Sequence, residues 1–383
     1  MNNNIRKNRM YINYIANWDR NRELTWSGTT YSLLTALESK STIYNININN
    51  SVNHFVAKVD KKIASVFGTN LDIDFLYRYV DKRSKRIVST SGFSEAINVQ
   101  IHSLVDIKES YIYEDLIWEA LQYTKEKDPK SFAFSGFQNI DKTTFSYNLK
   151  RQSDFLGKDK IILSMSHWLT NFINEKTPHR AVYVGGGINV KSFSIPIHLR
   201  DAATFLFVGK DFYRKGGDLV VAAFQKIKQL YPEAKLIIAG PDSLSSEITA
   251  IKGIQFVGNV SVNKVSQLMA SSTIFVMPSR FEAYGLVFIE AMAMGMPIIV
   301  RDKYEMPHFV LQGAGMVMKS EMTDELEISN LVTCMSHMLE EKLQYLTKAR
   351  ELSPKIIAEY SWESVANRII SEIQSRLSDN SIQ

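Results

Sequence analysis

Two glutamates eight positions apart, Glu282 and Glu290, lie in a stretch that could bind an anionic ligand. The pattern of Met277–Val300 predicts the end of a strand, a loop, a helix that Gly285 opens, and the start of another strand. A loop that leads into a helix presents unpaired backbone N–H groups and the positive end of the helix dipole, which together suit a phosphate group. We therefore predict an anion site beside the two carboxylates, at the backbone of Tyr284, Gly285, Leu286 and Val287.

A second loop carries three basic side chains. Lys210, Arg214 and Lys215 lie in G-K-D-F-Y-R-K-G-G, between the predicted strand Thr204–Val208 and the predicted helix Asp218–Tyr231. Basic residues crowded by glycines on a strand-to-helix turn are typical of a phosphate site. A solvated basic turn is the alternative.

Two loops of the N-terminal half could face the same ligand. W-S-G-T places Gly28 between a predicted strand and a predicted helix, and Asp115 follows the predicted strand Tyr111–Tyr113 in Y-E-D-L. Ligands of α/β folds bind at the carboxyl ends of parallel strands, so both loops are candidate site elements. Helix capping is the alternative, with Ser27 or Thr29 as the cap in the first loop and Asp115 in the second.

The elements that would position these residues alternate between strand and helix, as in an α/β protein with parallel sheets. Val52–Phe67 is predicted to be an amphipathic helix, and His102 is expected on a helix, packed rather than catalytic. Three glycines in G-G-G-I-N, Gly185–Asn189, suit a hinge, and the linker is expected at about Val190–Asp201. The strands predicted before this hinge are Met10–Ala16, Ser41–Ile48, Lys85–Ser89, Tyr111–Tyr113, Ile161–Ser164 and Val182–Val184.

Composition limits the classes of function. The 383 residues are 45% hydrophobic and 22% charged, which is enough for two globular domains, and the net charge of +5 without a long basic block argues against a nucleic-acid partner. The single cysteine, Cys334, excludes a disulfide framework within the chain and a cysteine-based zinc site. No segment has the apolar length of a signal peptide or a membrane span, so we expect a cytoplasmic protein with at most peripheral contact to the inner face of a membrane.

The stretch E-A-Y-G-L-V-F-I-E followed by A-M-A-M-G-M-P-I-I-V resembles the E-x7-E donor-site signature of the retaining, two-domain (GT-B fold) glycosyltransferases, the group 1 enzymes of bacterial polysaccharide and lipopolysaccharide synthesis. The loop with Lys215 is similar to that family's G-R-x4-K-G, with Lys210 where arginine is usual and Arg214 nearby. G-G-G-I-N is similar to the family's hinge P-N-G-x-(N/D). In the D-K-Y-E-M-P-H stretch at 302–308 only Pro307 matches the family's G-G-x-P-E, which puts a site role of that loop in doubt.

The resemblance implies a fold and roles for the residues above. It implies two facing Rossmann-like domains, residues 1–190 on the acceptor side and 202–355 for the nucleotide sugar, with a helix at 356–383 that crosses back. It implies that Glu290 binds the ribose and that Glu282 holds the donor sugar. Asp115 would lie near the reacting sugar and Gly28 near the donor phosphates, while the leaving diphosphate would be neutralised by Lys210, Arg214, Lys215 and the backbone at residues 284–287.

The implied reaction is transfer of a sugar, with retention, from a nucleoside diphosphate sugar to a hydroxyl of a glycan or lipid-linked glycan, as in a growing O-antigen or capsule. No metal and no cofactor are expected; the D-x-D at Asp72–Asp74 is interpreted as capping acids, and the histidines lack metal-ligand spacing. The alternatives are a GT-B sugar epimerase or phosphorylase, and a non-catalytic partner subunit with the same fold.

Overall fold

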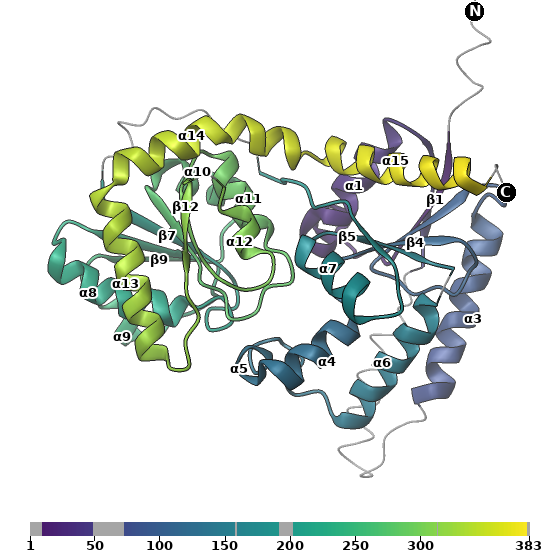
Figure 1. Cartoon of the computed structure of the whole chain (residues 1–383), viewed down its shortest axis with the longest axis horizontal. Coiled ribbons are helices and arrows are strands. Elements are labelled where there is room, and N and C mark those ends of the chain that lie inside the picture. Colours follow the sequence, from purple (N-terminus) through teal and green to yellow (C-terminus); the bar gives the residue numbers. More distant parts are fainter. Residues whose placement is uncertain (1–9, 49–72, 158, 191–201, 312, 381–383) are drawn as a thin grey trace, which may run out of the picture.

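The computed structural model describes residues 10–48, 73–157, 159–190, 202–311 and 313–380. It contains two six-stranded sheets in which every strand pair is parallel, with helices packed on both (Figure 1). The N-terminal sheet has the strand order β2-β1-β3-β4-β5-β6. Its strands are β1 Tyr11–Ala16, β2 Thr42–Asn47, β3 Ile97–Ile101, β4 Ser110–Glu114, β5 Ile161–Ser164 and β6 Ala181–Tyr183.

The C-terminal sheet has the order β12-β11-β10-β7-β8-β9, and its central strands are nearly continuous apolar runs, as strands covered on both faces require. Its strands are β7 Thr204–Val208, β8 Lys235–Ala239, β9 Ile254–Gly258, β10 Ile274–Val276, β11 Ile298–Arg301 and β12 Gly315–Met318. The predicted pair of parallel α/β units is therefore confirmed.

The helices of the N-terminal half are α1 Thr29–Glu38, α3 Ile73–Ser91, α4 Trp118–Lys127, α5 Pro129–Phe132, α6 Lys142–Leu156 and α7 His167–Lys176, with the short helix η1 Arg22–Gly28 before α1. Those of the C-terminal half are α8 Gly217–Leu230, α9 Ser246–Thr249, α10 Val262–Ser271, α11 Leu286–Ala293, α12 Met306–Phe309, α13 Asp324–Glu340, α14 Lys342–Glu359 and α15 Trp362–Asn380. None of the helices in the described part of the chain is both long enough and apolar enough to cross a membrane.

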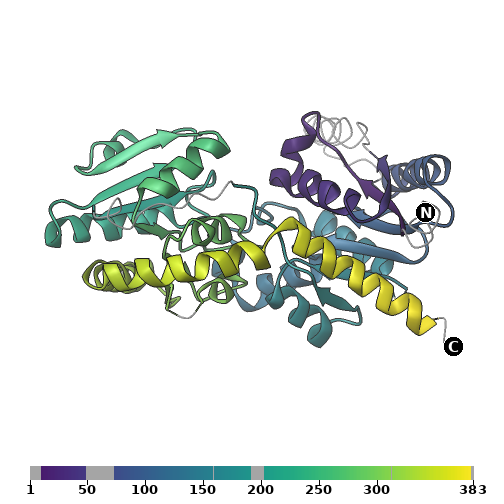
Figure 2. The same cartoon turned by 90° about the horizontal axis from the view of Figure 1, so that it is seen from above.

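The last two helices connect the halves. Figures 1 and 2 show α14 along the C-terminal half and α15 along the N-terminal half, where α15 packs against α1. Arg368 on α15 donates from Nε to the carbonyl of Val184 (2.7 Å), at the end of the N-terminal sheet. The chain thus returns to its first half after completing the second.

One predicted strand is wrong. Lys85–Ser89 lies inside helix α3, not in the sheet, and the third strand is β3, further along the chain. The buried residues Val80, Ser84 and Val88 recur every four positions, which is the spacing of one helix face and not the alternation of a strand. The helix predicted at Val52–Phe67 lies outside the described residues, as does most of the predicted linker.

Candidate active site

The loop between β10 and α11 carries the first predicted glutamate in a nearly buried position. Glu282 is 7% exposed, and its Oε2 accepts a hydrogen bond from Ser279 Oγ (3.3 Å). Gly285 has a φ of +100°, and a Cβ there would lie 2.6 Å from the Phe288 ring, so glycine alone fits the turn into the helix. Arg280 fixes the loop on the C-terminal domain through two bonds to the Asp218 carboxylate in the first turn of α8 (2.6 and 2.9 Å).

The basic loop after β7 meets this carboxylate. Lys215 Nζ forms an ion pair with Glu282 Oε2, and Arg214 Nη1 lies 4.0 Å from the same oxygen. Arg214 also donates to the Phe281 carbonyl (3.1 Å) and pairs with Asp211 (3.2 Å). Burial lowers the pKa of Lys215, and the nearby Glu282 carboxylate opposes that effect. The two predicted motifs therefore form one cluster, while Lys210 is exposed at the start of the loop.

Three helices begin in the same unusual way. The residue before α1, α8 and α11 is a glycine in the left-handed region, namely Gly28 (φ 88°), Gly216 (φ 76°) and Gly285 (φ 100°), and no described side chain caps any of the three. By contrast, Asp, Ser or Thr side chains cap α5, α6, α7, α9, α10 and α13. The first N–H groups of α1, α8 and α11 therefore have no side-chain acceptor, and an anion can take that place.

Glu290 lies on α11 close to the hinge of the N-terminal half. Burial raises the pKa of Glu290 to about 7, and a hydrogen bond from the backbone N–H of Asn189 opposes this rise. Near neutral pH the Glu290 carboxyl group is therefore partly protonated and partly ionised. The interdomain contact continues at Tyr284, whose buried hydroxyl accepts from the N–H of Gly186 (3.0 Å).

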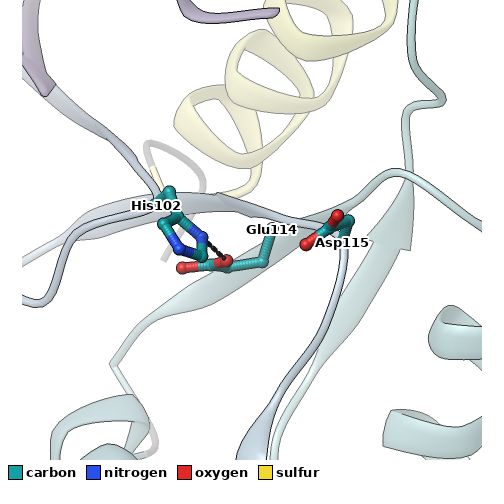
Figure 3. A group of neighbouring side chains, drawn as sticks. All are labelled: His102, Glu114 and Asp115. Carbon is teal, nitrogen blue, oxygen red and sulfur yellow. Dashed lines mark hydrogen bonds and ion pairs between the residues drawn. The ribbon is translucent and has the colours of Figure 1, made fainter. Parts of the chain in front are cut away.

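On the N-terminal side, a second charged cluster lies at the carboxyl ends of β3 and β4 (Figure 3). His102 Nδ1 bonds to Glu114 Oε2 (2.7 Å), and the carboxylate raises the pKa of His102 to about 9. Asp115 lies beside this pair, and burial, with added repulsion from Glu114 and Glu282, raises the pKa of Asp115 to about 6. Because repulsion from Glu282 contributes to the raised pKa of Asp115, the cluster of Asp115 and the cluster of Glu282 face each other across the domain boundary.

Strained backbone conformations occur at His102 and in the glycine loop beside it. His102 has a φ of +45°, and its ring stacks on Trp26 (ring centroids 5.1 Å apart), which has a φ of +48° in the glycine loop. Ser27 follows with a φ of +58°. Residues with side chains rarely hold left-handed angles, and strain of this kind gathers at functional sites.

The cluster offers one possible metal-binding group. His102, Glu114 and Asp115 each provide a ligand atom within 4.8 Å of the others. A metal would have to displace the proton that the ion pair with Glu114 holds on His102 at neutral pH. The sequence-based expectation of no metal therefore stays a prediction.

Several expectations about individual residues are wrong. His102 follows a strand and is not on a helix, and 61% of its side chain is exposed. Capping does not explain the two N-terminal loops, because the N-cap of α1 is Gly28, not Ser27 or Thr29, and Ile117, not Asp115, precedes α4.

The loop that matched the family least is also an interdomain contact. Glu305 is fully buried, and its carboxylate accepts from the N–H of Trp168 (3.1 Å) and bonds to His167 Nδ1 (2.7 Å) in the first turn of α7. Trp168 Nε1 also donates to the Ala283 carbonyl (2.9 Å), next to Glu282. Nothing in the spacing of the sequence indicates these contacts, since they join segments more than a hundred residues apart.

Comparison with known proteins finds a family match in the second half of the chain. Residues 193–349 match the family described as "Glycosyl transferases group 1". The "Phosphatidylinositol N-acetylglucosaminyltransferase gpi3 subunit" of Schizosaccharomyces pombe is 25% identical over 193 residues, which are 48% of this chain and 41% of that protein. The "GDP-mannose-dependent monoacylated alpha-(1-6)-phosphatidylinositol monomannoside mannosyltransferase" of Corynebacterium glutamicum is 26% identical over 174 residues, 42% of this chain and 44% of that protein. The matched part thus spans less than half of either relative.

Solved structures agree over nearly the whole chain. The sucrose-phosphate synthase of Thermosynechococcus elongatus has a TM-score of 0.68 at 15% identity, covering 97% of this chain and 100% of that one. WaaG, "a glycosyltransferase involved in lipopolysaccharide biosynthesis", has a TM-score of 0.62 at 14% identity, covering 94% and 99%. Identities this low indicate the fold alone. Residues 193–349 thus resemble the glycosyl transferases group 1, and over nearly its whole length the chain has the two-domain GT-B fold.

Proposed function

We propose that this protein transfers a sugar from a nucleoside diphosphate sugar to a hydroxyl group, with retention at the anomeric carbon. The observation that carries the proposal is the meeting of Lys215 and Arg214 with Glu282 at the N-termini of α8 and α11. Two cations and two uncapped helix ends in one place suit a group with two or more negative charges, such as a diphosphate.

The ion pair between Lys215 Nζ and Glu282 Oε2 suggests how a donor would bind. A bound diphosphate would compete for the lysine and release Glu282 to accept hydroxyl groups of the donor sugar. Glu290, which is half-buried on α11, would accept hydrogen bonds from the ribose hydroxyls. Stabilising the leaving diphosphate in this way is electrostatic catalysis and needs no metal.

The charge state of His102 supports retention rather than inversion. A histidine paired with a carboxylate can act as a general base on an acceptor hydroxyl, which is the step that an inverting transfer requires. Because Glu114 raises the pKa of His102 to about 9, the imidazole holds its proton at neutral pH and is a poor base there. In the retaining step the bond from C1 to the phosphate oxygen breaks, the bond from C1 to the acceptor oxygen forms on the same face, and the phosphate oxygen takes the acceptor's proton. Asp115 would orient the acceptor or stabilise positive charge on the sugar ring.

The test is an assay with a panel of UDP-, GDP- and ADP-sugars and glycan acceptors. Mass spectrometry should detect an acceptor heavier by one sugar, and NMR of the product should show the donor's anomeric configuration. Conversion of the donor to an isomer without an acceptor would indicate an epimerase. Tight nucleotide binding with no turnover of any donor would indicate a non-catalytic partner.

We further propose a lipid-linked or growing bacterial surface glycan as the acceptor, used at the inner face of a membrane. The likeness to WaaG supports this choice, as does the basic outer face of α3 with the exposed residues Lys82, Arg83, Lys85 and Arg86. Clustered basic side chains attract anionic lipid headgroups. Co-sedimentation with phosphatidylglycerol vesicles should fall when Lys82, Arg83 and Arg86 are changed together to Gln, and binding that is unchanged by this substitution would contradict the membrane contact.

A further inference from the structure

Arg280 connects the two loops that would bind the diphosphate. It lies in the loop before α11, and its backbone N–H donates to the carbonyl of Arg214 (2.8 Å) in the loop after β7. Its Nη1 donates to the carbonyl of Tyr213 in that same loop (2.8 Å), and its guanidinium pairs with Asp218 in the first turn of α8 (2.6 Å). The side chain is only 2% exposed. Arg280 therefore sets the position of the N-terminus of α8 relative to that of α11.

A segment of the N-terminal half, residues 128–134, contacts this arginine in two ways. The guanidinium of Arg280 lies over the ring of Phe134, 4.6 Å from its centroid. Its Nη2 also pairs with Oδ2 of Asp324 in the first turn of α13 (3.0 Å), and Nζ of Lys130 on α5 pairs with Oδ1 of the same carboxylate (3.1 Å). A cation of one half is thus joined to the loops of the other half through a shared carboxylate.

The charges of these ion pairs balance when Lys130 is included. Arg280 shares one positive charge between two carboxylates, Asp218 and Asp324. Lys130 supplies the second positive charge, and its Nζ also lies 3.4 Å from the buried carboxylate of Glu327. Without Lys130 the attraction of Asp324 for Arg280 increases, which draws the guanidinium away from Asp218. The lysine therefore helps to keep Arg280 between α8 and α13.

A second lysine keeps the segment attached to the C-terminal half. Lys303, in the loop after β11, pairs with Asp128 and donates to Ser131 Oγ (2.9 Å). Loss of Lys130 alone therefore leaves this segment docked. The side chains of Lys130 and Asp324 are 35% and 47% exposed, so their interaction is partly screened, moderate in strength and sensitive to salt.

We propose that Lys130 is a positioning residue for the donor diphosphate, which acts through Asp324 on Arg280 and so on the two loops that bind the phosphates. This inference rests on the proposed function, because it takes these loops as the diphosphate site. Lys130 belongs to the N-terminal half, so binding of the phosphates by the C-terminal half depends on the contact between the halves. A role in packing alone would depend neither on the charge at position 130 nor on the carboxylate of Asp324.

Titration calorimetry with inorganic pyrophosphate, UDP and GDP tests this dependence. Lys130→Met should weaken pyrophosphate binding about three- to fivefold in about 50 mM salt and less than about twofold in about 500 mM salt, each relative to wild type. The nucleotide of UDP and GDP that binds more tightly should weaken by the same factor. Lys130→Arg keeps the charge and should bind as the wild type does. In the Asp324→Asn background, Lys130→Met should change the affinity less than about twofold.

The matched control is Lys127→Met, which removes the same charge at an exposed position at the end of α4 and should change the affinity less than about twofold. An equal loss in Lys127→Met, an equal loss in both Asp324 backgrounds, or a Lys130→Arg protein as weak as Lys130→Met would overturn the positioning role.

The variant Lys215→Ala separates this inference from the proposed function. If Lys215→Ala weakens pyrophosphate binding and Lys130→Met does not, this inference fails and the proposed function stands. If the wild type binds neither pyrophosphate nor a nucleotide, or Lys215→Ala binds pyrophosphate as well as the wild type does, both fail together. If Lys130→Met does not fold, the comparison of Lys130→Gln with Lys130→Arg gives the same decision.

Discussion

Replacing Glu290 by glutamine should raise the free energy of unfolding of the ligand-free protein above neutral pH and should weaken its binding of the donor. Burial raises the pKa of Glu290 from its ordinary value of 4.5 to about 7. The unfolded chain therefore releases this proton at a lower pH than the folded chain does, so folding becomes less favourable as the pH rises from 4.5 towards 7. Glutamine resembles the protonated form and avoids that cost. It also keeps an acceptor for the N–H of Asn189.

The size of the effect follows from the two pKa values. A difference between 4.5 and about 7 gives about 3 kcal/mol at pH 8 in full, and the remaining solvent contact of the half-buried carboxyl reduces this to roughly 2–3 kcal/mol. At pH 5 the folded carboxyl keeps its proton, and the gain should fall below about 1 kcal/mol. In kinetics, loss of a group that binds the ground state and the transition state alike raises the donor KM and leaves kcat mostly intact.

Urea unfolding of wild type and Glu290→Gln at pH 5 and pH 8, followed by circular dichroism, measures the first effect, and steady-state kinetics measure the second. Glu233→Gln, at an exposed position before β8, is the matched control and should change stability by less than about 0.5 kcal/mol at either pH. A Glu290→Gln protein that is less stable than wild type at pH 8 would refute the reasoning, because it would mean that the ionised carboxylate is stabilised and not penalised by its surroundings.

Three further predictions concern the chemistry. Lys215→Ala should lower kcat/KM roughly 30- to 1000-fold, the equivalent of about 2–4 kcal/mol, because a charge-assisted contact to the diphosphate is lost, while Lys210→Arg should be tolerated; unchanged turnover in Lys215→Ala would contradict the diphosphate site. Glu282→Gln should lower kcat more than donor affinity, since bonds to the sugar hydroxyls strengthen as positive charge develops; kinetics combined with calorimetry decide this, and the reverse pattern would reject the role. Activity should persist in excess EDTA; loss on chelation that manganese restores would point instead to a metal beside Asp115.

The order of elements and the motif loops could be predicted from the sequence because each depends on neighbouring residues. The turn at Gly285 and the alternation around it are local patterns, and β10, α11 and β11 lie where those patterns place them. The failure at Lys85–Ser89 is also local in origin. Apolar Ile87 and Val88 beside β-branched Thr90 suggest a strand in a short window, while the helical spacing becomes evident only over three turns of α3.

The candidate site was predicted only in part, because its remaining members depend on tertiary contacts. The proximity of Lys215 and Glu282 could be expected, since the sequence patterns assign both residues to one candidate donor site. His102 could not, because its role comes from Glu114 on the neighbouring strand and from a ring stacked on Trp26. Glu305 lies in a stretch that departs from the family pattern, and only the packing of the two domains shows what it contacts.

The contact of Glu305 with α7 has a consequence for exchange of the two halves between proteins of this fold. The carboxylate is fully buried, and its partners, the N–H of Trp168 and the ring of His167, belong to the other half of the chain. A chimera that joins this C-terminal half to a foreign N-terminal half would bury Glu305 without those donors, at a cost of roughly 3–5 kcal/mol. An exchange would therefore have to carry the first turn of α7 along with it, or replace Glu305 by an apolar side chain, so the two halves are not independent modules for engineering.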